Sequence, residues 1–256
     1  MRIGCKRGKD GGTIDDANER RGGEAIEGAK GGFVELAQEG GGGMKIFEKR
    51  KCGYRREIRI LGLRVFAYGK SNIIQEGKGN TFINIPPWLD LVCYGDNNTV
   101  EFGPNTSFCG RIQIGEPKFP VHGCVVKVGE GTVSGGCWMI LMEHDSKVTI
   151  GKNCGIAPDV EFWCSDTHSM VNEAGEVVNR GRFIEVGDHV WIGKRAAIMK
   201  NTKIPDGCIV GFGAIVSSGV KAEAKSIIAG NPAKVVRTGI NWNGARPDAI
   251  SNHPIL

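Results

Sequence analysis

The chain has 256 residues, of which 40% are hydrophobic, and its formal net charge at pH 7 is +5. This length can bury a substantial core in one elongated domain or two small ones. Forty glycines and only 7% aromatic residues argue against a core of large side chains and favour a backbone that turns often. No window approaches the roughly 18 apolar residues of a membrane-spanning helix. Nine cysteines without a Cys-x-x-Cys pair favour reduced thiols over disulfides or a zinc site.

The first 43 residues contain thirteen glycines among mixed charges, show no apolar periodicity and end in a run of four glycines before Met44. Residues 1–43 are therefore expected to be a disordered extension. Met44 is a second candidate for the start of the protein. Because the first sixteen residues hold no apolar stretch of signal-peptide length, a cytoplasmic location is expected.

Residues 45–70 carry nine Lys or Arg against two Glu. Their pattern mixes a possible amphipathic helix with a short strand, and we interpret residues 44–71 as a basic cap segment. A solvated basic face is the plain interpretation, and attraction to a membrane surface or an acidic polysaccharide is the sharper one. Nucleic acid is not an expected partner, because no binding motif accompanies the charge.

A six-residue period runs from about Asn72 and is clearest toward the C-terminus. The first position of each hexad is β-branched, as in Val186, Ile192, Ile198, Ile204, Val210 and Val216. The residue four places later is small or compact, as in Val190, Ala196, Thr202, Cys208, Ala214 and Val220. About 18% of the residues are Ile or Val, so six successive matches have a chance probability on the order of 10⁻⁵ to 10⁻⁴, which indicates a true repeat.

Each hexad is expected to form one short strand and one tight turn, so that three hexads close a triangular coil. First positions then point inward and stack on their equivalents 18 residues away, as Ile192 would on Val210, each contributing about 1.5–3 kcal/mol of burial. Cys154 and Cys208 fall on the compact inward positions. The turn positions at which a positive φ is expected are Gly207, Gly213 and Gly219.

The repeat is interrupted in three places. Residues 116–126 and 140–148 are expected to be corner loops. The longest break, residues 169–183, is a polar excursion between two regular stretches. A loop that projects from a rigid scaffold often carries substrate contacts, and a mere insertion is the alternative.

Three motifs carry a resemblance to a known family: Ser165-Asp166-Thr167-His168-Ser169, Val190-Trp191-Ile192-Gly193 and Ala229-Gly230-Asn231-Pro232-Ala233. In this combination the chain resembles the hexapeptide-repeat acyltransferases, which include the maltose and galactoside O-acetyltransferases, and above all the polysaccharide O-acetyltransferases. The resemblance implies an all-β fold, a left-handed parallel β-helix over residues 72–237 with a projecting loop and short helical or irregular termini. Residues 238–256 would form a tail. It also implies a homotrimer with active sites at the subunit interfaces.

Acyl transfer from a thioester to a hydroxyl needs a base for the hydroxyl proton, and a neutral imidazole performs this step near pH 7. His168 occupies the family's catalytic position, so the resemblance implies that it is the general base. Asp166 or Glu143 is a candidate to hold its second ring nitrogen. Cys164 as an acyl-enzyme nucleophile is a weaker alternative, because the family transfers acyl groups directly.

The resemblance implies acetyl-CoA as the acyl donor, and no metal is expected. Residues 186–237 carry eight Lys or Arg against three Asp or Glu, an excess that suits phosphate binding. Trp191 precedes an inward Ile and should face outward. It would then either line a ligand-binding surface or serve only in packing. By motif position, the residues expected to bind the donor are Trp191, Gly193, Lys194, Ala214, Lys221, Lys234 and Arg237.

The acceptor is less well defined, because Met139 stands where sugar acetyltransferases place an Asn. A hydroxyl of a sugar or polysaccharide is the favoured acceptor. An antibiotic or other small-molecule hydroxyl, N-acylation of an amino sugar and a noncatalytic β-helix scaffold are the alternatives. A zinc-dependent hydratase, a function that carbonic anhydrases perform on this fold, is disfavoured because none of the five histidines are closely spaced.

Overall fold

The computed structural model describes residues 47–52, 55–60, 63–68 and 71–247. The regular elements in these ranges are all β-strands. The segment 1–43, which is expected to be disordered, lies outside the described residues. Within the described part of the chain, no helix is long and apolar enough to cross a membrane.

The basic segment forms three antiparallel strands, β1 (Phe47–Cys52), β2 (Arg55–Ile60) and β3 (Leu63–Tyr68). The amphipathic helix considered for this segment is therefore wrong. Charged and apolar residues alternate from Glu57 to Ile60, a period of two that is typical of a strand, and strand pairing prevails over the weak helical pattern.

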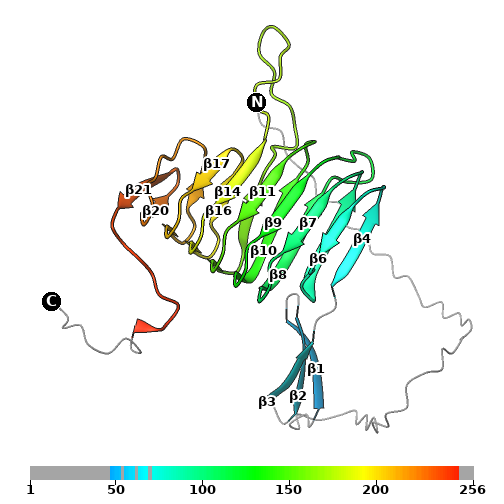
Figure 1. Ribbon diagram of the computed structural model, residues 1–256, viewed down its shortest axis with the longest axis vertical. Coiled ribbons are helices and arrows are strands. Elements are labelled where there is room, and N and C mark those ends of the chain that lie inside the picture. Colours follow the sequence, from blue (N-terminus) through cyan, green and yellow to red (C-terminus); the bar gives the residue numbers. More distant parts are fainter. Residues whose placement is uncertain (1–46, 53–54, 61–62, 69–70, 248–256) are drawn as a thin grey trace, which may run out of the picture. The chain divides into compact units, whose positions relative to one another are not determined.

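The main domain is a parallel β-helix in which successive coils stack strand on strand (Figure 1). Face A consists of β12 (Gly155–Ile156), β15 (Trp191–Ile192), β18 (Ile209–Val210) and β20 (Ile227–Gly230). Face B consists of β4 (Asn72–Glu76), β6 (Trp88–Tyr94), β8 (Ser107–Ile114), β10 (Val133–Leu141), β13 (Val160–Trp163), β16 (Ala197–Met199) and β19 (Ile215–Val216). Face C consists of β5 (Thr81–Ile83), β7 (Thr99–Phe102), β9 (Val125–Val128), β11 (Lys147–Ile150), β14 (Phe183–Val186) and β17 (Thr202–Ile204).

Two features complete this domain. The long strand β10 bends between Ser134 and Cys137, so that its first part pairs with β12 of face A and its second with β13 of face B. The last strand, β21 (Ala233–Arg237), turns back and pairs antiparallel with β20. The all-β class and the left-handed parallel β-helix expected from the sequence are confirmed.

The hexad register is also confirmed. Val186 pairs with Ile204 and Ile192 with Val210 on the next coil, in each case 18 residues on. All four side chains are buried and belong to one continuous core cluster. The compact positions that are likewise buried are Cys154, Val190, Ala196, Thr202, Cys208 and Ala214. Val220 is partly buried and packs against the same cluster.

The corners repeat with the same period as the core. A left-handed backbone recurs three residues after each first hexad position, at His189, Arg195, Asn201, Gly207 and Gly213. Gly207 and Gly213 therefore have the positive φ expected of them, whereas Gly219 does not. Between β19 of face B and β20 of face A the chain forms no strand of face C, so no equivalent corner forms at Gly219.

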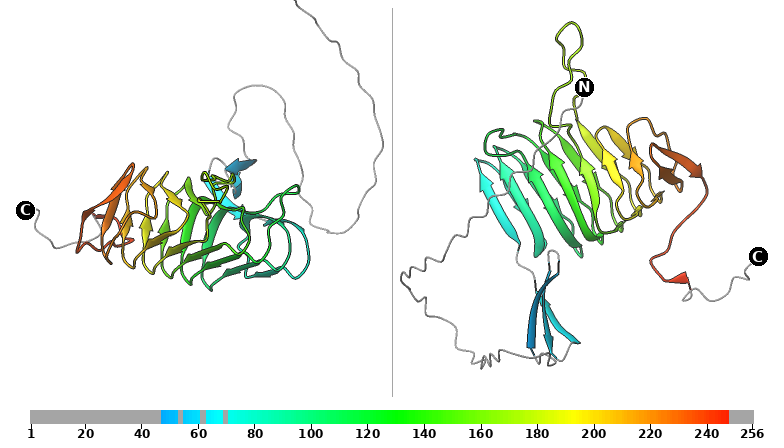
Figure 2. Two further views of the ribbon diagram at one scale, coloured as in Figure 1. Left: turned by 90° about the horizontal axis from the view of Figure 1, so that it is seen from above. Right: turned by 180° about the vertical axis from the view of Figure 1, so that it is seen from behind.

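Three connections between face B and face C are longer than a regular corner, residues 115–124, 142–146 and 164–182. They correspond to the interruptions expected from the sequence. Residues 164–182, called the projecting loop below, extend beyond the stacked coils (Figures 1 and 2). Its outer part folds back on itself, with an antiparallel bridge between Val171 and Val177.

Candidate active site

His168 lies at the base of the projecting loop, on the corner between faces B and C. Its neighbour Thr167 has a left-handed backbone, with φ of 63°, and the His168 side chain is exposed. Asn179, on the returning limb of the loop, donates a hydrogen bond from Nδ2 to the His168 carbonyl oxygen at 2.8 Å. The His168 imidazole forms no hydrogen bond or ion pair with any residue that the structure describes. This ring is thus held at its backbone and open at both nitrogens.

Asn179 is a site residue that the sequence analysis missed. It is 8% exposed, and its Oδ1 accepts a hydrogen bond from the Met170 N–H at 2.8 Å. Its Nδ2 bonds to Asp166 Oδ2 as well as to His168. A buried amide that joins both limbs fixes the base of the loop. An Asn inside a polar loop gives no sequence signal of this contact.

Asp166 forms no hydrogen bond or ion pair with His168. Its carboxylate accepts hydrogen bonds from Lys200 Nζ and from Asn179 Nδ2. Lys200 lies on the next coil, directly after β16. The structure therefore places Asp166 in a salt bridge that joins the loop to its neighbouring coil.

Glu143 forms no hydrogen bond or ion pair with His168 either. Its carboxylate accepts hydrogen bonds from Ser165 Oγ at 3.0 Å and from the Gly181 N–H at 2.9 Å. Gly181 must be glycine here, because a Cβ would overlap the Cys164 carbonyl oxygen. Glu143 therefore fastens both ends of the projecting loop to the preceding coil.

Cys164 points into the core beside this corner. It is fully buried, and burial raises the pKa of its thiol to about 12. A thiol with this pKa stays protonated at neutral pH and is a poor nucleophile. The structure thus argues against the acyl-enzyme alternative.

Trp191 lies on the outer surface of face A and is 44% exposed, as expected. Trp191 begins a row of paired residues across the sheet: it pairs with Ile209, Ile209 pairs with Ile227, and Ile227 pairs with Arg237 of β21. Three steps of about 4.8 Å between neighbouring strands place Trp191 and Arg237 about 14 Å apart along this row. Lys234 lies on the same last strand, opposite Ala229.

Four other predicted donor contacts already have partners within the fold. The Gly193 N–H donates to the Val210 carbonyl oxygen at 2.8 Å. Ala214 is buried, and both of its backbone groups bond within the coils. Lys194 pairs with Asp159 at 3.5 Å, and Lys221 Nζ lies 3.4 Å from the Ser218 carbonyl oxygen. The first two residues have no backbone donor left for a ligand, whereas the two lysines lie on the surface.

Trp242, in the C-terminal tail, also borders face A. Its ring stacks on the His189 ring with centroids 4.4 Å apart, and it lies 6.2 Å from the Trp191 ring. A Cβ on Gly155 would come within 3.2 Å of the Trp242 ring, so glycine leaves room for the tail. The sequence analysis did not single out Trp242, although a tryptophan within a polar tail is a signal that could have drawn attention to it.

His168 and Trp191 do not meet within one chain. His168 lies on the corner between faces B and C, whereas Trp191 follows the corner between faces C and A. The strand β14 (Phe183–Val186) of face C lies between them. One chain by itself therefore separates the candidate base from the candidate donor surface.

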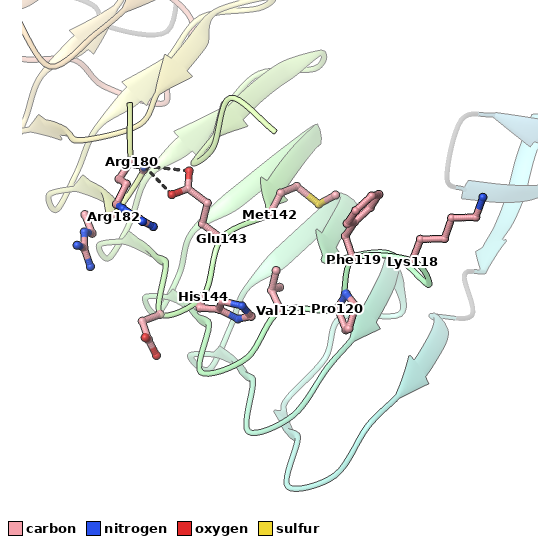
Figure 3. Close-up of a pocket in the computed structure, with 11 residues that line it drawn as sticks. Lys118, Phe119, Pro120, Val121, Met142, Glu143, His144, Arg180 and Arg182 are labelled. Carbon is pink, nitrogen blue, oxygen red and sulfur yellow. Dashed lines mark hydrogen bonds between the residues drawn. The ribbon is translucent and has the colours of Figure 1, made fainter. Parts of the chain in front are cut away.

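A pocket of about 500 Å³ opens on the corner between faces B and C (Figure 3). It is lined by residues 118–121, 142–145 and 180–182, which belong to the three long connections between these faces. Among the residues described, no group of three or more His, Cys, Asp or Glu side chains could hold a metal ion.

No protein-family model matches the chain. Among curated proteins, it is similar to the polysialic acid O-acetyltransferase of Escherichia coli O1:K1 / APEC, with 32% identity over 127 residues, 49% of this chain and 40% of the relative. It is also similar to the galactoside O-acetyltransferase of Escherichia coli K12, with 33% identity over 95 residues, 36% of this chain and 45% of the relative. The chain thus spans less than half the length of these two curated relatives.

Among solved structures, the polySia-specific acetyltransferase NeuO has a similar fold, with a TM-score of 0.60 and 25% sequence identity. The similarity covers 72% of this chain and 85% of NeuO. The chain is therefore a hexapeptide-repeat β-helix protein with the fold of an acetyltransferase. Its curated relatives include polysialic acid and galactoside O-acetyltransferases, which confirms the resemblance found in its motifs.

Proposed function

We propose that the chain is an acetyl-CoA-dependent O-acetyltransferase that acts on a hydroxyl of a sugar or polysaccharide. The observation that carries this proposal is the exposed His168 imidazole, held at the base of the projecting loop and open at both ring nitrogens. The names of the polysialic acid and galactoside O-acetyltransferases, two of its curated relatives, support both the reaction and a carbohydrate acceptor.

In the proposed reaction, a neutral His168 accepts the proton of the acceptor hydroxyl as its oxygen attacks the thioester carbonyl carbon. The new C–O ester bond forms, the C–S bond breaks and the sulfur of coenzyme A takes up the proton from the imidazolium. Asp166 and Glu143 contribute by fixing the loop that carries His168, since each carboxylate already has partners of its own.

The row from Trp191 to Arg237 is the proposed donor surface. Its length of about 14 Å suits an extended pantetheine arm, with Trp191 toward the acyl end. Arg237 and Lys234 lie exposed at the other end, where they would meet the phosphates. Gly193 and Ala214 contribute to the packing of the coils and not to the donor surface, because their backbone groups form hydrogen bonds within the β-helix.

We further propose a homotrimer. The separation of His168 and Trp191 on different corners of one chain supports an assembly in which a neighbouring copy brings a donor surface to each base. Analytical ultracentrifugation gives the oligomeric state, and a protein that is monomeric by this measurement yet fully active in the kinetic assay would contradict this part of the proposal.

The proposed function is tested by thiol release from acetyl-CoA with a panel of acceptors. Oligosialic acid, maltose, a galactoside, chloramphenicol and an amino sugar cover the acceptor classes considered above. Release that depends on a sugar, with an O-acetyl ester found in the product by mass spectrometry, is the expected result. Transfer to chloramphenicol alone would make the protein a xenobiotic acetyltransferase, and an amide product would make it an N-acyltransferase. Absence of transfer to any acceptor by the intact assembly would favour a binding scaffold.

A further inference from the structure

The pocket on the corner between faces B and C has two chemically different ends. Figure 3 shows Phe119 and Met142 toward one end and Arg180 and Arg182 toward the other. His144 also lines the pocket. The pocket therefore combines the apolar side chains of Phe119 and Met142, beside which Lys118 lies, with two arginines at the opposite end.

The two arginines are free to bind a ligand. Both are exposed, and neither guanidinium forms an ion pair or hydrogen bond with any residue placed in the structure. Glu143 and Asp145 also line the pocket, but neither carboxylate forms an ion pair with either arginine. Glu143 instead accepts hydrogen bonds from Ser165 and Gly181. A guanidinium presents paired N–H donors that match a carboxylate, so this end suits an anionic ligand.

The opposite end suits the apolar face of a sugar ring. Phe119 is 67% exposed, so its ring is accessible to a ligand. His144 stacks on His122 with ring centroids 5.1 Å apart, and its Nδ1 accepts a hydrogen bond from the His122 N–H at 3.0 Å. The Nε2–H of a neutral His144 ring then remains available to donate to a ligand oxygen.

The pocket is joined to the candidate base through the projecting loop. Arg180 directly follows Asn179, whose side chain bonds to the His168 carbonyl oxygen at 2.8 Å. Gly181 and Arg182 continue along the same limb, which Glu143 fastens to the coil. A ligand bound by Arg180 and Arg182 would thus lie beside the limb that positions His168.

From this arrangement we infer that the pocket is an acceptor subsite for a carboxylated sugar residue of an acidic glycan. Arg180 and Arg182 bind the carboxylate, and Phe119 packs against the sugar ring. The inference rests on the proposed function, because it specifies the acceptor class of the same enzyme.

Binding of oligosialic acid to the full chain, measured by titration calorimetry without acetyl-CoA, tests the inference independently of catalysis. The matched probe is the same oligosaccharide with its carboxyl groups reduced to alcohols. We expect the double variant Arg180→Gln/Arg182→Gln to bind oligosialic acid about tenfold more weakly, since two charge-assisted contacts are lost. Phe119→Ala should weaken the binding of both oligosaccharides. Lys152→Gln, which removes one exposed charge on the corner between faces C and A, should bind oligosialic acid as the unmodified chain does.

The outcomes separate the two proposals. Binding that prefers oligosialic acid, depends on the arginines and persists in His168→Ala supports the subsite even if no transfer is detected. Equal binding of both probes, or no effect of the double arginine variant, overturns the subsite, and sugar-dependent transfer would then still support the proposed function. An increase in KM for acetyl-CoA, with glycan binding unchanged, would assign the arginines to the donor and also overturn the inference.

Discussion

The Trp242 indole donates a hydrogen bond from Nε1 to the His189 carbonyl oxygen at 2.7 Å, while its ring stacks on the His189 imidazole at an interplanar angle of 9°. His189 Nε2 in turn lies 3.1 Å from the Trp242 carbonyl oxygen. These contacts join residues 53 positions apart and fasten the tail to the corner beside face A.

Trp242→Ala should lower the free energy of unfolding by about 1–3 kcal/mol, because a ring stack and a hydrogen bond are lost together. Trp242→Phe keeps an aromatic ring and loses only the Nε1 donor, so its loss should be smaller, roughly 1 kcal/mol. Urea denaturation of both variants measures the difference. Unchanged stability of Trp242→Ala would mean that the tail does not depend on this contact.

His168→Ala should lower kcat by about 10²–10⁴-fold, the usual contribution of a general base, with the core intact because the side chain is exposed. Thiol release with a sugar acceptor gives the rate, and circular dichroism checks the fold. Ser169→Ala, at the next exposed position, is the matched control and should retain activity. A nearly normal rate in His168→Ala would remove this residue from the mechanism.

Glu143→Ala should loosen the projecting loop, since the Ser165 hydroxyl and the Gly181 N–H lose their common acceptor. Faster hydrogen exchange at Gly181 and faster proteolysis within residues 169–178 are expected. Glu143→Gln retains one carboxamide oxygen and should show a smaller change. Glu173→Gln, at an exposed position in the same loop, is the control. Identical exchange in all three variants would contradict a fastening role for Glu143.

The buried cysteines should make the protein sensitive to alkaline pH. Burial raises the pKa of Cys137 and of Cys164 from the ordinary value of 9.0 to about 12. An unfolded chain loses these protons near pH 9.0, whereas the folded chain keeps them, so the associated stability is fully present below pH 9.0 and is lost as pH rises toward 12.

Urea denaturation between pH 8 and pH 11 measures this loss, and Cys164→Ala provides a variant without one of the two thiols. Its stability should decline less steeply with pH than that of the unmodified chain. Rapid modification of Cys137 or Cys164 by a thiol reagent at pH 8, located by peptide mapping, would show that these two cysteines are accessible, contrary to their burial.

The core could be predicted from sequence because a β-helix repeats one local environment. Each inward position stacks on an equivalent position 18 residues away, so Ile192 and Val210 reveal their contact through spacing alone. The segment around Glu57 was harder, since its short alternating pattern competes with a helical one and carries no repeat. The positive φ predicted at Gly219 was wrong, because no strand of face C follows that position.

The candidate base could be located because His168 stands where the periodic pattern gives way to a polar loop. The contacts that hold the loop around His168 could not be predicted from the sequence. Glu143 and Gly181 are 38 residues apart, and their contact depends on how one irregular corner stacks on the next. The same holds for Trp242 on His189, which requires the tail to turn back along the helix.

The sequence by itself determined the fold, the inward residues and the position of the exposed histidine, because these follow from a period that each coil repeats. Only the tertiary structure decided which polar side chains already have partners. In the structure the carboxylates of Asp166 and Glu143 hold the projecting loop. The backbone N–H groups of Gly193 and Ala214 already donate hydrogen bonds within the coils. The side chains of Arg180 and Arg182 have no partner among the described residues. The physical reason is that stacking places residues of different corners side by side, and the non-repeating corners have no period from which their contacts follow.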